Sequence, residues 1–234
     1  MSVVIAIPTI SGSVRSECLT STLAATRALT TRGVEHDVIV LADCPVLPVA
    51  RNTLVAMFMQ TGMDDLFFID SDVGFDPAAF LAILDRPERV VAGVYPLKRP
   101  TGGWPVQIQT RDGVPIGRDG LIEADYLPAG FMRIKRIVIE RMQEAYPELR
   151  YAKNVVHVND AHIHDAYDFF NMGAVDGQTW RTEDYAFCKR WRDIGGQLWV
   201  YPDCDFSHIG TMAYRGNYHR WLLGEHHAVE SGIK

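Results

Sequence analysis

The stretch Leu66-Phe67-Phe68-Ile69-Asp70-Ser71-Asp72 is the part of the sequence that says most about the fold. Its apolar residues are typical of a buried β-strand, and two carboxylates separated by one residue follow at once. Side chains two positions apart in an extended segment point to the same side. Because ligands bind outside the carboxyl ends of strands in an open α/β sheet, the stretch predicts a buried strand ending in a pair of acids at a ligand-binding edge.

The surrounding sequence alternates strand-like and helix-like segments. Strands are expected at residues 3–7, 38–41, 66–69 and 90–95, and helices at about 16–32, 48–61 and 77–84. Asp76-Pro77 has the pattern of a helix start, a capping acid followed by Pro at the first helical position. The alternation predicts a parallel sheet with helices on both faces.

The second half changes character. Segments 106–109 and 121–124 flank Gly and Asp turns and are expected to form antiparallel strands, with a further short strand at 131–134. Helices are expected at 136–145 and over the segment in which Phe187, Trp191 and Ile194 share one face. A last strand is expected at 198–201. The expected class is α/β, with a central, mixed, mostly parallel sheet.

The composition of the chain limits which kinds of protein it can be. The chain has 234 residues, of which 47% are hydrophobic, enough for one sizeable domain. Its net charge of −6 argues against a strongly basic nucleic-acid surface. No apolar run is long enough to span a membrane, and residues 1–8 do not resemble a signal peptide. The dispersed cysteines, Cys18, Cys44, Cys188 and Cys204, are typical of a reduced, cytoplasmic protein with structural thiols.

Two acidic side chains and one histidine are candidates for a metal site. Asp70 and Asp72 can hold a divalent cation through oxygen ligands, and that cation can hold a diphosphate. His208 follows the last expected strand, and a neutral imidazole can complete a carboxylate site. The alternative is structural: Asp72 or Asp76 caps the next helix, and His208 belongs to the core.

A second acidic pair, Glu183-Asp184, follows Thr182 at the start of an expected helix. With Thr182 as the N-cap, both acids lie in the first turn, where the helix dipole stabilises negative charge. In the functional alternative, one carboxylate is a general base that faces an acceptor hydroxyl.

Arg51-Asn52 and Gly130 are further candidates. Arg51 can present its donor fork to a phosphate or a nucleobase edge, or be an ordinary surface cation. Gly130 allows close backbone approach by a ligand, or only satisfies a turn.

Taken together, these pieces resemble a GT-A glycosyltransferase close to the family 2 type. The matching elements, in order, are Ile7-Pro8-Thr9, Ala50-Arg51-Asn52, Phe68-Ile69-Asp70-Ser71-Asp72, Leu127-Pro128-Ala129-Gly130-Phe131, Thr182-Glu183-Asp184-Tyr185-Ala186-Phe187 and Ser207-His208-Ile209-Gly210. The resemblance covers about residues 3–215. It implies one GT-A domain over residues 1–234, with a nucleotide-binding half (1–100), an acceptor-binding half (101–215) and a C-terminal tail (216–234).

The resemblance also implies roles for these residues. Asp70, Asp72 and His208 would bind Mn²⁺ or Mg²⁺. The sugar nucleotide would contact Pro8, Thr9, Arg51, Asn52, Asp70, Ser71 and Gly130. Asp184 is the first candidate for the base and Glu183 the second. The stretch from Tyr151 to Trp180 has no family counterpart and is a candidate acceptor-binding lid.

We therefore expect metal-dependent transfer of a sugar from a nucleotide-diphosphate sugar to an acceptor hydroxyl. Inversion is implied by the resemblance alone, and retention remains open. Glycans, lipid-linked saccharides, proteins and modified DNA remain open as acceptors, and the oligomeric state is open. The alternatives are a sugar-phosphate nucleotidylyltransferase and a non-catalytic nucleotide-sugar-binding module. An NAD enzyme is disfavoured because no GxGxxG follows the first expected strand.

Overall fold

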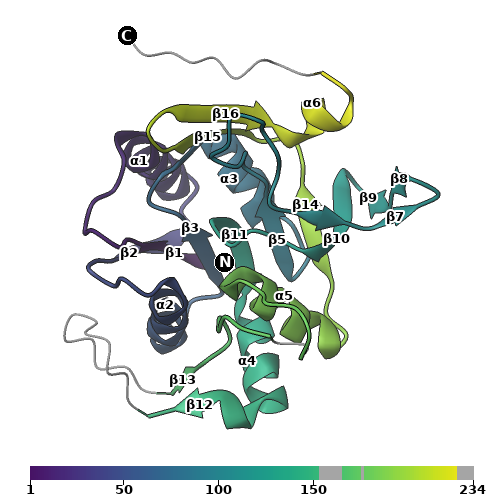
Figure 1. Ribbon diagram of the computed structural model, residues 1–234. Coiled ribbons are helices and arrows are strands. Elements are labelled where there is room, and N and C mark those ends of the chain that lie inside the picture. The colour runs from purple at the N-terminus through teal and green to yellow at the C-terminus, as the bar shows by residue number, and fades with distance from the viewer. Residues whose placement is uncertain (153–164, 175–176, 226–234) are drawn as a thin grey trace.

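A central twisted sheet organises the chain in the computed structural model, which describes residues 1–152, 165–174 and 177–225 (Figure 1). The strand order is β2-β1-β3-β11-β5-β14-β10-β6, with β9 paired to β10. Strands β2, β1, β3, β5 and β14 run in one direction, and β11 and β10 run against them. The expected mixed, mostly parallel α/β sheet is confirmed.

The strands of this sheet are β1 (Ser2–Pro8), β2 (Glu35–Leu41), β3 (Asp65–Ile69), β5 (Val90–Gly93), β6 (Gln107–Ile108), β9 (Gly117–Arg118), β10 (Leu121–Tyr126), β11 (Phe131–Lys135) and β14 (Leu198–Tyr201). A hairpin of β7 (Thr110–Arg111) and β8 (Val114–Pro115) projects beside them, and β12 (Arg150–Tyr151) pairs with β13 (Ala166–Tyr167).

The helices are α1 (Ser16–Thr31), α2 (Leu47–Thr61), α3 (Pro77–Leu84), α4 (Arg136–Ala145), α5 (Glu183–Asp193) and α6 (Tyr218–Leu222), with the short 3₁₀ helix η1 at Pro147–Leu149. Figure 1 shows α1 and α3 on one side of the sheet and α2, α4 and α5 on the other. Among the described residues, no helix is long and apolar enough to cross a membrane.

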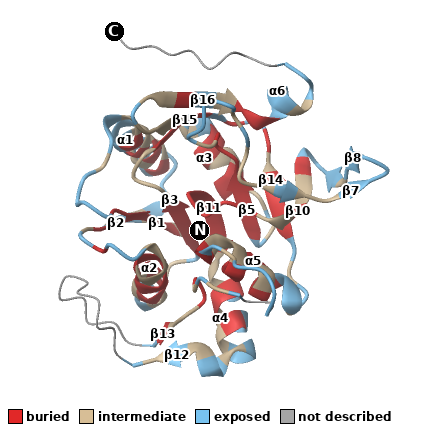
Figure 2. Cartoon of the chain, in the orientation of Figure 1, coloured by how far each residue is buried: buried red, intermediate tan, exposed pale blue. Residues whose placement is uncertain are grey.

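The central strands are buried on both faces because both are covered by helices (Figure 2). In β3, Phe67 contributes to the core under α1 and α3, and Phe68 to the core under α2, α4 and α5. Each such side chain stabilises the fold by about 1.5–3 kcal/mol relative to exposure. This explains why the decisive stretch is continuously apolar and does not alternate with polar residues.

A smaller sheet, β16-β15-β4, crosses the edge at which β3 ends. It joins β4 (Val73–Phe75), which follows Asp72 directly, to β15 (Asp205–Ile209) and β16 (Ala213–Asn217). The sequence analysis did not anticipate this sheet. It pairs residues that are far apart in the sequence and sets the geometry of the candidate site.

Two expectations need comment. Residues 153–164 and 175–176, within the expected lid from Tyr151 to Trp180, lie outside the described residues, as does 226–234 of the expected tail. The described part of that tail is folded: Asn217 ends β16, and Tyr218 begins α6 and is buried against the main core.

Candidate active site

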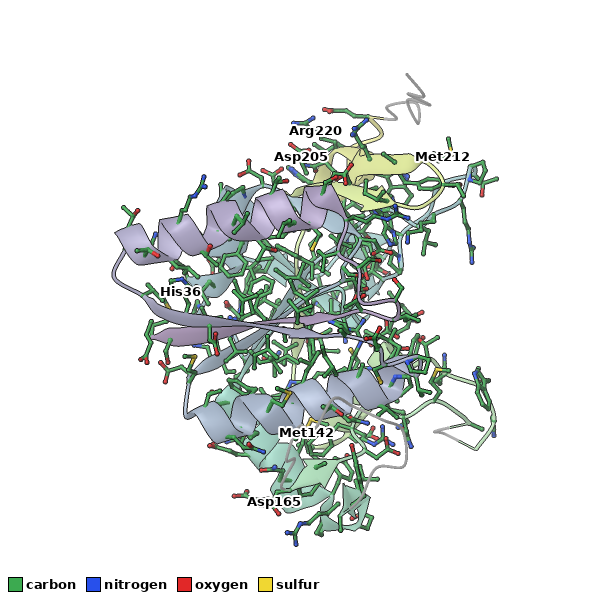
Figure 3. All side chains as sticks on the ribbon, turned by 90° about the vertical axis from the view of Figure 1, so that its left-hand side faces the viewer. His36, Met142, Asp165, Asp205, Met212 and Arg220 are labelled. Carbon is green, nitrogen blue, oxygen red and sulfur yellow. The ribbon has the colours of Figure 1, made fainter. Side chains whose placement is uncertain are left out.

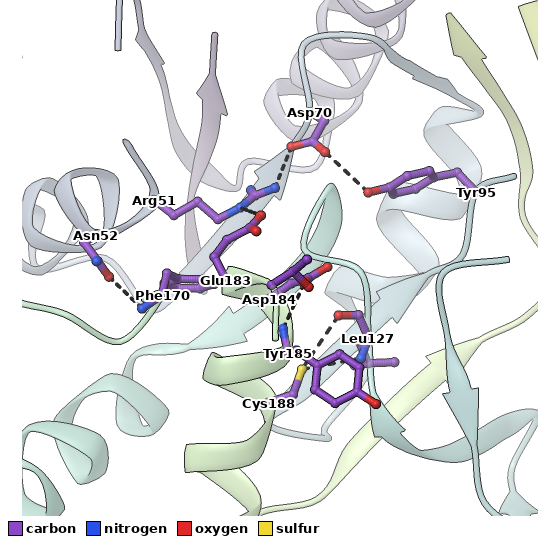
Figure 4. A network of polar contacts seen from close by, with 11 residues as sticks. Arg51, Asn52, Asp70, Tyr95, Leu127, Phe170, Glu183, Asp184, Tyr185 and Cys188 are labelled. Atoms are coloured by element: carbon purple, nitrogen blue, oxygen red, sulfur yellow. Dashed lines mark hydrogen bonds and ion pairs between the residues drawn. The ribbon is translucent and has the colours of Figure 1, made fainter. Parts of the chain in front are cut away.

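Asp70 lies at the carboxyl end of β3 and is held from both sides (Figure 4). Its Oδ1 accepts a hydrogen bond from Nη2 of Arg51 at 2.9 Å, and its Oδ2 accepts one from the Tyr95 hydroxyl at 3.3 Å. Its backbone N–H donates to the carbonyl of Gly130 at 2.9 Å. The carboxylate therefore has one defined orientation, directed toward Arg51 and Tyr95.

Gly130 lies where the backbone of the turn before β11 approaches these side chains. A Cβ placed there would lie 2.3 Å from both the Asp70 Oδ2 and the Tyr95 hydroxyl. The sequence analysis left open whether Gly130 serves a ligand or a turn. The structure shows that the groups in closest approach are Asp70 and Tyr95, so Gly130 is required for this contact.

Arg51, on α2, connects the two acidic motifs. Its Nε donates to Oε1 of Glu183 at 3.3 Å, and its side chain is 2% exposed. Burial alone would lower the pKa of this guanidinium, but the carboxylates of Asp70 and Glu183 outweigh that effect and raise the pKa, so Arg51 stays charged. Arg51 is thus a buried bridge between the end of β3 and the start of α5.

Asp72 and His208 are brought together by the small sheet. His208 lies opposite Val73 in the pairing of β15 with β4, and the N–H of Ile209 donates to the carbonyl of Asp72 at 2.8 Å. As a result, Nε2 of His208 lies 3.4 Å from Oδ1 of Asp72. Lys98 forms an ion pair with the other oxygen, Oδ2.

Oδ1 of Asp72 and Nε2 of His208 are the atoms of this pair that could hold a divalent cation, since Oδ2 of Asp72 is paired with Lys98. Nδ1 of His208 lies 2.8 Å from the carbonyl of Pro96, which can only accept, so Nδ1 carries a proton. In the neutral imidazole, Nε2 then presents a lone pair beside a carboxylate oxygen, and two adjacent acceptors suit a cation. A backbone carbonyl behind the ligating imidazole is the usual orienting partner of a metal-bound His.

Asp70 does not complete this pair in the structure. Within the described parts of the chain, no three His, Cys, Asp or Glu side chains converge as a metal cluster. The physical reason is the buried guanidinium of Arg51, which needs carboxylate partners and takes Asp70 as one of them. Of the three expected ligands, the structure brings together Asp72 and His208.

Asp184 lies in the first turn of α5, beside Glu183. Its Oδ1 accepts from the Thr182 hydroxyl at 2.5 Å and from the N–H of Tyr185 at 2.8 Å, and within the described residues its Oδ2 has no hydrogen bond. Thr182 occupies the N-cap position as expected, but its hydroxyl serves Asp184 and not a backbone N–H. Burial, and then the charge of Glu183, raise the pKa of Asp184.

The other predicted contacts lie around this edge. Pro8 ends β1, and Thr9 follows it, with its hydroxyl donating to the carbonyl of Ser13 at 2.9 Å. The carbonyl of Ser71 accepts from the N–H of Arg15. Asn52 is 2% exposed, and its amide binds Asp168 at 2.8 Å and the N–H of Phe170 at 2.9 Å. Asn52 therefore anchors the segment before α5.

Tyr95 and Lys98 are site residues for which the sequence analysis proposed no such role. Tyr95 is 6% exposed, and burial, followed by the charge of Asp70, raises the pKa of its hydroxyl well above the usual value, so it remains a donor. A signal was available: Tyr95 follows a strand parallel to β3, and the carboxyl ends of parallel strands meet at one edge.

Comparison with solved structures places the fold among known ones. No family model and no curated protein sequence matches the chain. The structure of A197 from STIV matches with a TM-score of 0.56 and 21% identity, covering 92% of this chain and 90% of that one. Drosophila β1,4-galactosyltransferase 7, in complex with xylobiose, matches with a TM-score of 0.44 and 15% identity, covering 100% of this chain and 76% of that one.

GalNAc-T7 with UDP, GalNAc and Mn²⁺ matches with a TM-score of 0.42 and 12% identity, covering 90% of this chain and 44% of that one. These two glycosyltransferases match with TM-scores below 0.5, whereas the match to A197 from STIV exceeds that value. At these identities the likenesses concern the fold alone.

Proposed function

We propose that the protein is a metal-dependent glycosyltransferase that moves a sugar from a nucleotide-diphosphate sugar to an acceptor hydroxyl. The observation that carries this proposal is the pairing of the Asp72 carboxylate with Nε2 of His208, 3.4 Å apart, just beyond the end of β3. The same edge holds a charged network that reaches the candidate base through Arg51 and Glu183.

The donor site is proposed to lie along this edge. Asp72 and His208 would hold Mn²⁺ or Mg²⁺, which supplies positive charge to the diphosphate leaving group. Pro8, Thr9 and Ser71 lie at or beside the strand ends and are proposed as nucleotide contacts. Arg51, Asn52 and Gly130 are proposed as positioning residues, because their polar groups or their backbone contact other parts of the protein.

Asp184 is proposed as the general base. Its Oδ1 is fixed by two hydrogen bonds, which leaves Oδ2 to accept the proton of the acceptor hydroxyl. As that proton is transferred, the acceptor oxygen bonds to the anomeric carbon and the bond from this carbon to the diphosphate breaks. A single displacement of this kind inverts the anomeric centre. Glu183, paired with Arg51, is the second candidate and is less accessible.

The first test is nucleotide binding followed by thermal shift. UDP or GDP should raise the melting temperature in the presence of Mn²⁺ or Mg²⁺ and not after EDTA treatment, because only the ligand-bound folded state is stabilised. Asp72→Ala should abolish the shift, whereas the control Asp37→Ala, on the exposed edge strand β2, should retain it. Equal shifts with and without divalent ions would contradict the metal-dependent donor site.

The second test separates transfer from the alternatives. Asp184→Asn should abolish donor hydrolysis and transfer while nucleotide binding stays near the wild-type level. A nucleotidylyltransferase would instead release pyrophosphate from a nucleoside triphosphate and a sugar phosphate. A wild-type protein that binds the nucleotide sugar but turns over none of the donors would be a binding module, and the proposed activity would be wrong.

A further inference from the structure

A cavity of about 1160 Å³ lies on the outer side of the small sheet. Its walls come from the start of α1, from β15 and β16, from the loop 96–104 and from α6. We call it the outer cavity. The side chains that hold Asp70, and the candidate base Asp184, do not line it. The outer cavity is therefore distinct from the proposed donor site.

Aromatic rings form one wall of the outer cavity. Trp221, on α6, is 43% exposed and stacks on Tyr218 with ring centroids 5.7 Å apart and planes 14° apart. Trp104 packs against the same Tyr218 at 5.3 Å. A Cβ on Gly216 would lie 2.8 Å from the Trp104 ring, so the backbone of β16 is in close contact with this ring. The rings of this wall are therefore closely packed, and the Trp221 ring remains accessible.

Charged side chains also line the outer cavity. In the described part of the chain, the exposed side chains of Arg99 and Arg215 have no hydrogen bond or ion pair. Arg220 lies 4.0 Å from the carboxylate of Asp205, and both are labelled at the outer edge of the molecule in Figure 3. Glu17 adds a second carboxylate from α1. Donors and acceptors are thus both present, with balanced charge.

We propose that the outer cavity binds a saccharide chain. A sugar ring presents a face of C–H bonds, which suits the electron-rich face of an exposed indole. Its edges carry hydroxyls, which both donate to carboxylates and accept from guanidinium groups. The mixture of Arg99, Arg215 and Arg220 with Glu17, Asp205 and Glu225 favours a neutral ligand over a polyanion such as DNA.

The loop 96–104 relates the outer cavity to the site at the end of β3. Lys98 forms an ion pair with Asp72, and the carbonyl of Pro96 orients His208, while Leu97 and Trp104 line the cavity. The saccharide is accordingly assigned as part of the acceptor. This last step rests on the proposed function, whereas the assignment of the cavity as a saccharide site does not.

The test is binding of the full chain to an array of immobilised oligosaccharides, without nucleotide or divalent ion. At least one oligosaccharide should bind, and calorimetry with that compound should show an affinity about tenfold or more weaker for Trp221→Ala, since a central aromatic anchor dominates binding. Trp221→Tyr should retain most of the affinity, because it retains an aromatic face. Arg215→Gln should weaken binding, because a neutral amide with two N–H groups replaces a charged guanidinium with five.

The matched control is Ile137→Ala. Ile137, on α4, is 41% exposed and does not line the outer cavity, so its truncation should leave the affinity unchanged. Absence of binding anywhere on the array, an unaffected Trp221→Ala variant, or equal losses in both variants would overturn the proposal. If nucleotide binding fails while saccharide binding follows Trp221, the donor chemistry is wrong and the cavity assignment holds. A bound saccharide that receives no sugar from any donor overturns only its role as acceptor.

Discussion

Arg51 is the residue on which the arrangement of the acids depends. It is buried, charged and shared between Asp70 and Glu183, which lie 113 positions apart in the sequence. A buried guanidinium without carboxylates would be strongly unfavourable, so Arg51 obliges both acids to approach it. Asp184, the proposed base, then lies next to a carboxylate whose own position is already fixed.

That proximity has a consequence for pH dependence. Asp184 acts as a base only when ionised, and burial together with the charge of Glu183 raises its pKa. The rate should therefore fall, as the pH is lowered, at a higher pH than for an ordinary Asp. Glu183→Gln removes the neighbouring charge, lowers the pKa of Asp184 and should move the acidic limb of the kcat/KM profile to lower pH.

The control for this shift is Glu144→Gln, an exposed change on α4. It should leave the acidic limb where it is in the wild-type protein. A Glu183→Gln profile that coincides with that of the wild type would show that Asp184 does not set the limb.

At the residue scale, the sequence could predict acids at the end of a strand because the apolar run and the acids adjoin. It placed Asp70, Asp72, His208, Glu183 and Asp184 in one site, and the structure brings Asp72 to His208 and Asp70 to Glu183 through Arg51. It could not predict that Asp70 would face Arg51 and Tyr95, because orientation depends on contacts between distant segments.

A second buried ion pair joins the neighbouring strands β3 and β11. Nη1 of Arg133 lies 3.5 Å from Oδ1 of Asp65. The Arg133 side chain is 0% exposed and that of Asp65 is 5% exposed. Burial raises the pKa of Asp65 and lowers that of Arg133, so each charge depends on the other for its compensation.

Breaking this pair should be costly. Asp65→Leu removes the carboxylate that pairs with this buried guanidinium and should lower the free energy of unfolding by about 3–5 kcal/mol. The double variant Asp65→Leu/Arg133→Leu should lose less than the sum of the single variants, as measured by urea denaturation. The exposed pair Arg32 and Asp85 is the control, where Asp85→Ala should cost about 1 kcal/mol or less. Strict additivity in the buried pair would contradict the coupling.

Elements with local signals were predicted well. Asp76 caps α3 by accepting from the N–H of Ala78 at 2.8 Å, and Gly62 ends α2 with a φ of 76°. The bounds of α4 agree with the predicted helix. The hairpin of β15 and β16 was missed because its strands are short and its pairing with β4 is between distant residues, which no local pattern reveals.

On the scale of the whole molecule, the two cores on opposite faces of the sheet enclose the thiols. Cys18, Cys44, Cys188 and Cys204 are all free and buried, as expected for structural thiols. Burial raises the pKa of Cys18 to about 12, so it stays a thiol near neutral pH.

We expect the folded protein to be unreactive toward the thiol reagent DTNB at neutral pH. All four cysteines should react after unfolding in urea, since thiolates form readily once the groups meet water. Absorbance of the released product gives the count. Rapid labelling of the native state would show that one of the cores opens locally.

The pairing of β4 with β15 has a consequence for synthesis. Asp72 leaves the ribosome long before His208, because more than half of the chain separates them in the sequence. A nascent chain that has been made as far as β11 already contains Asp70 and Asp72 but cannot assemble the pair with His208 until β15 has emerged. Ligand capture that needs both side chains is thereby delayed until β15 has been translated.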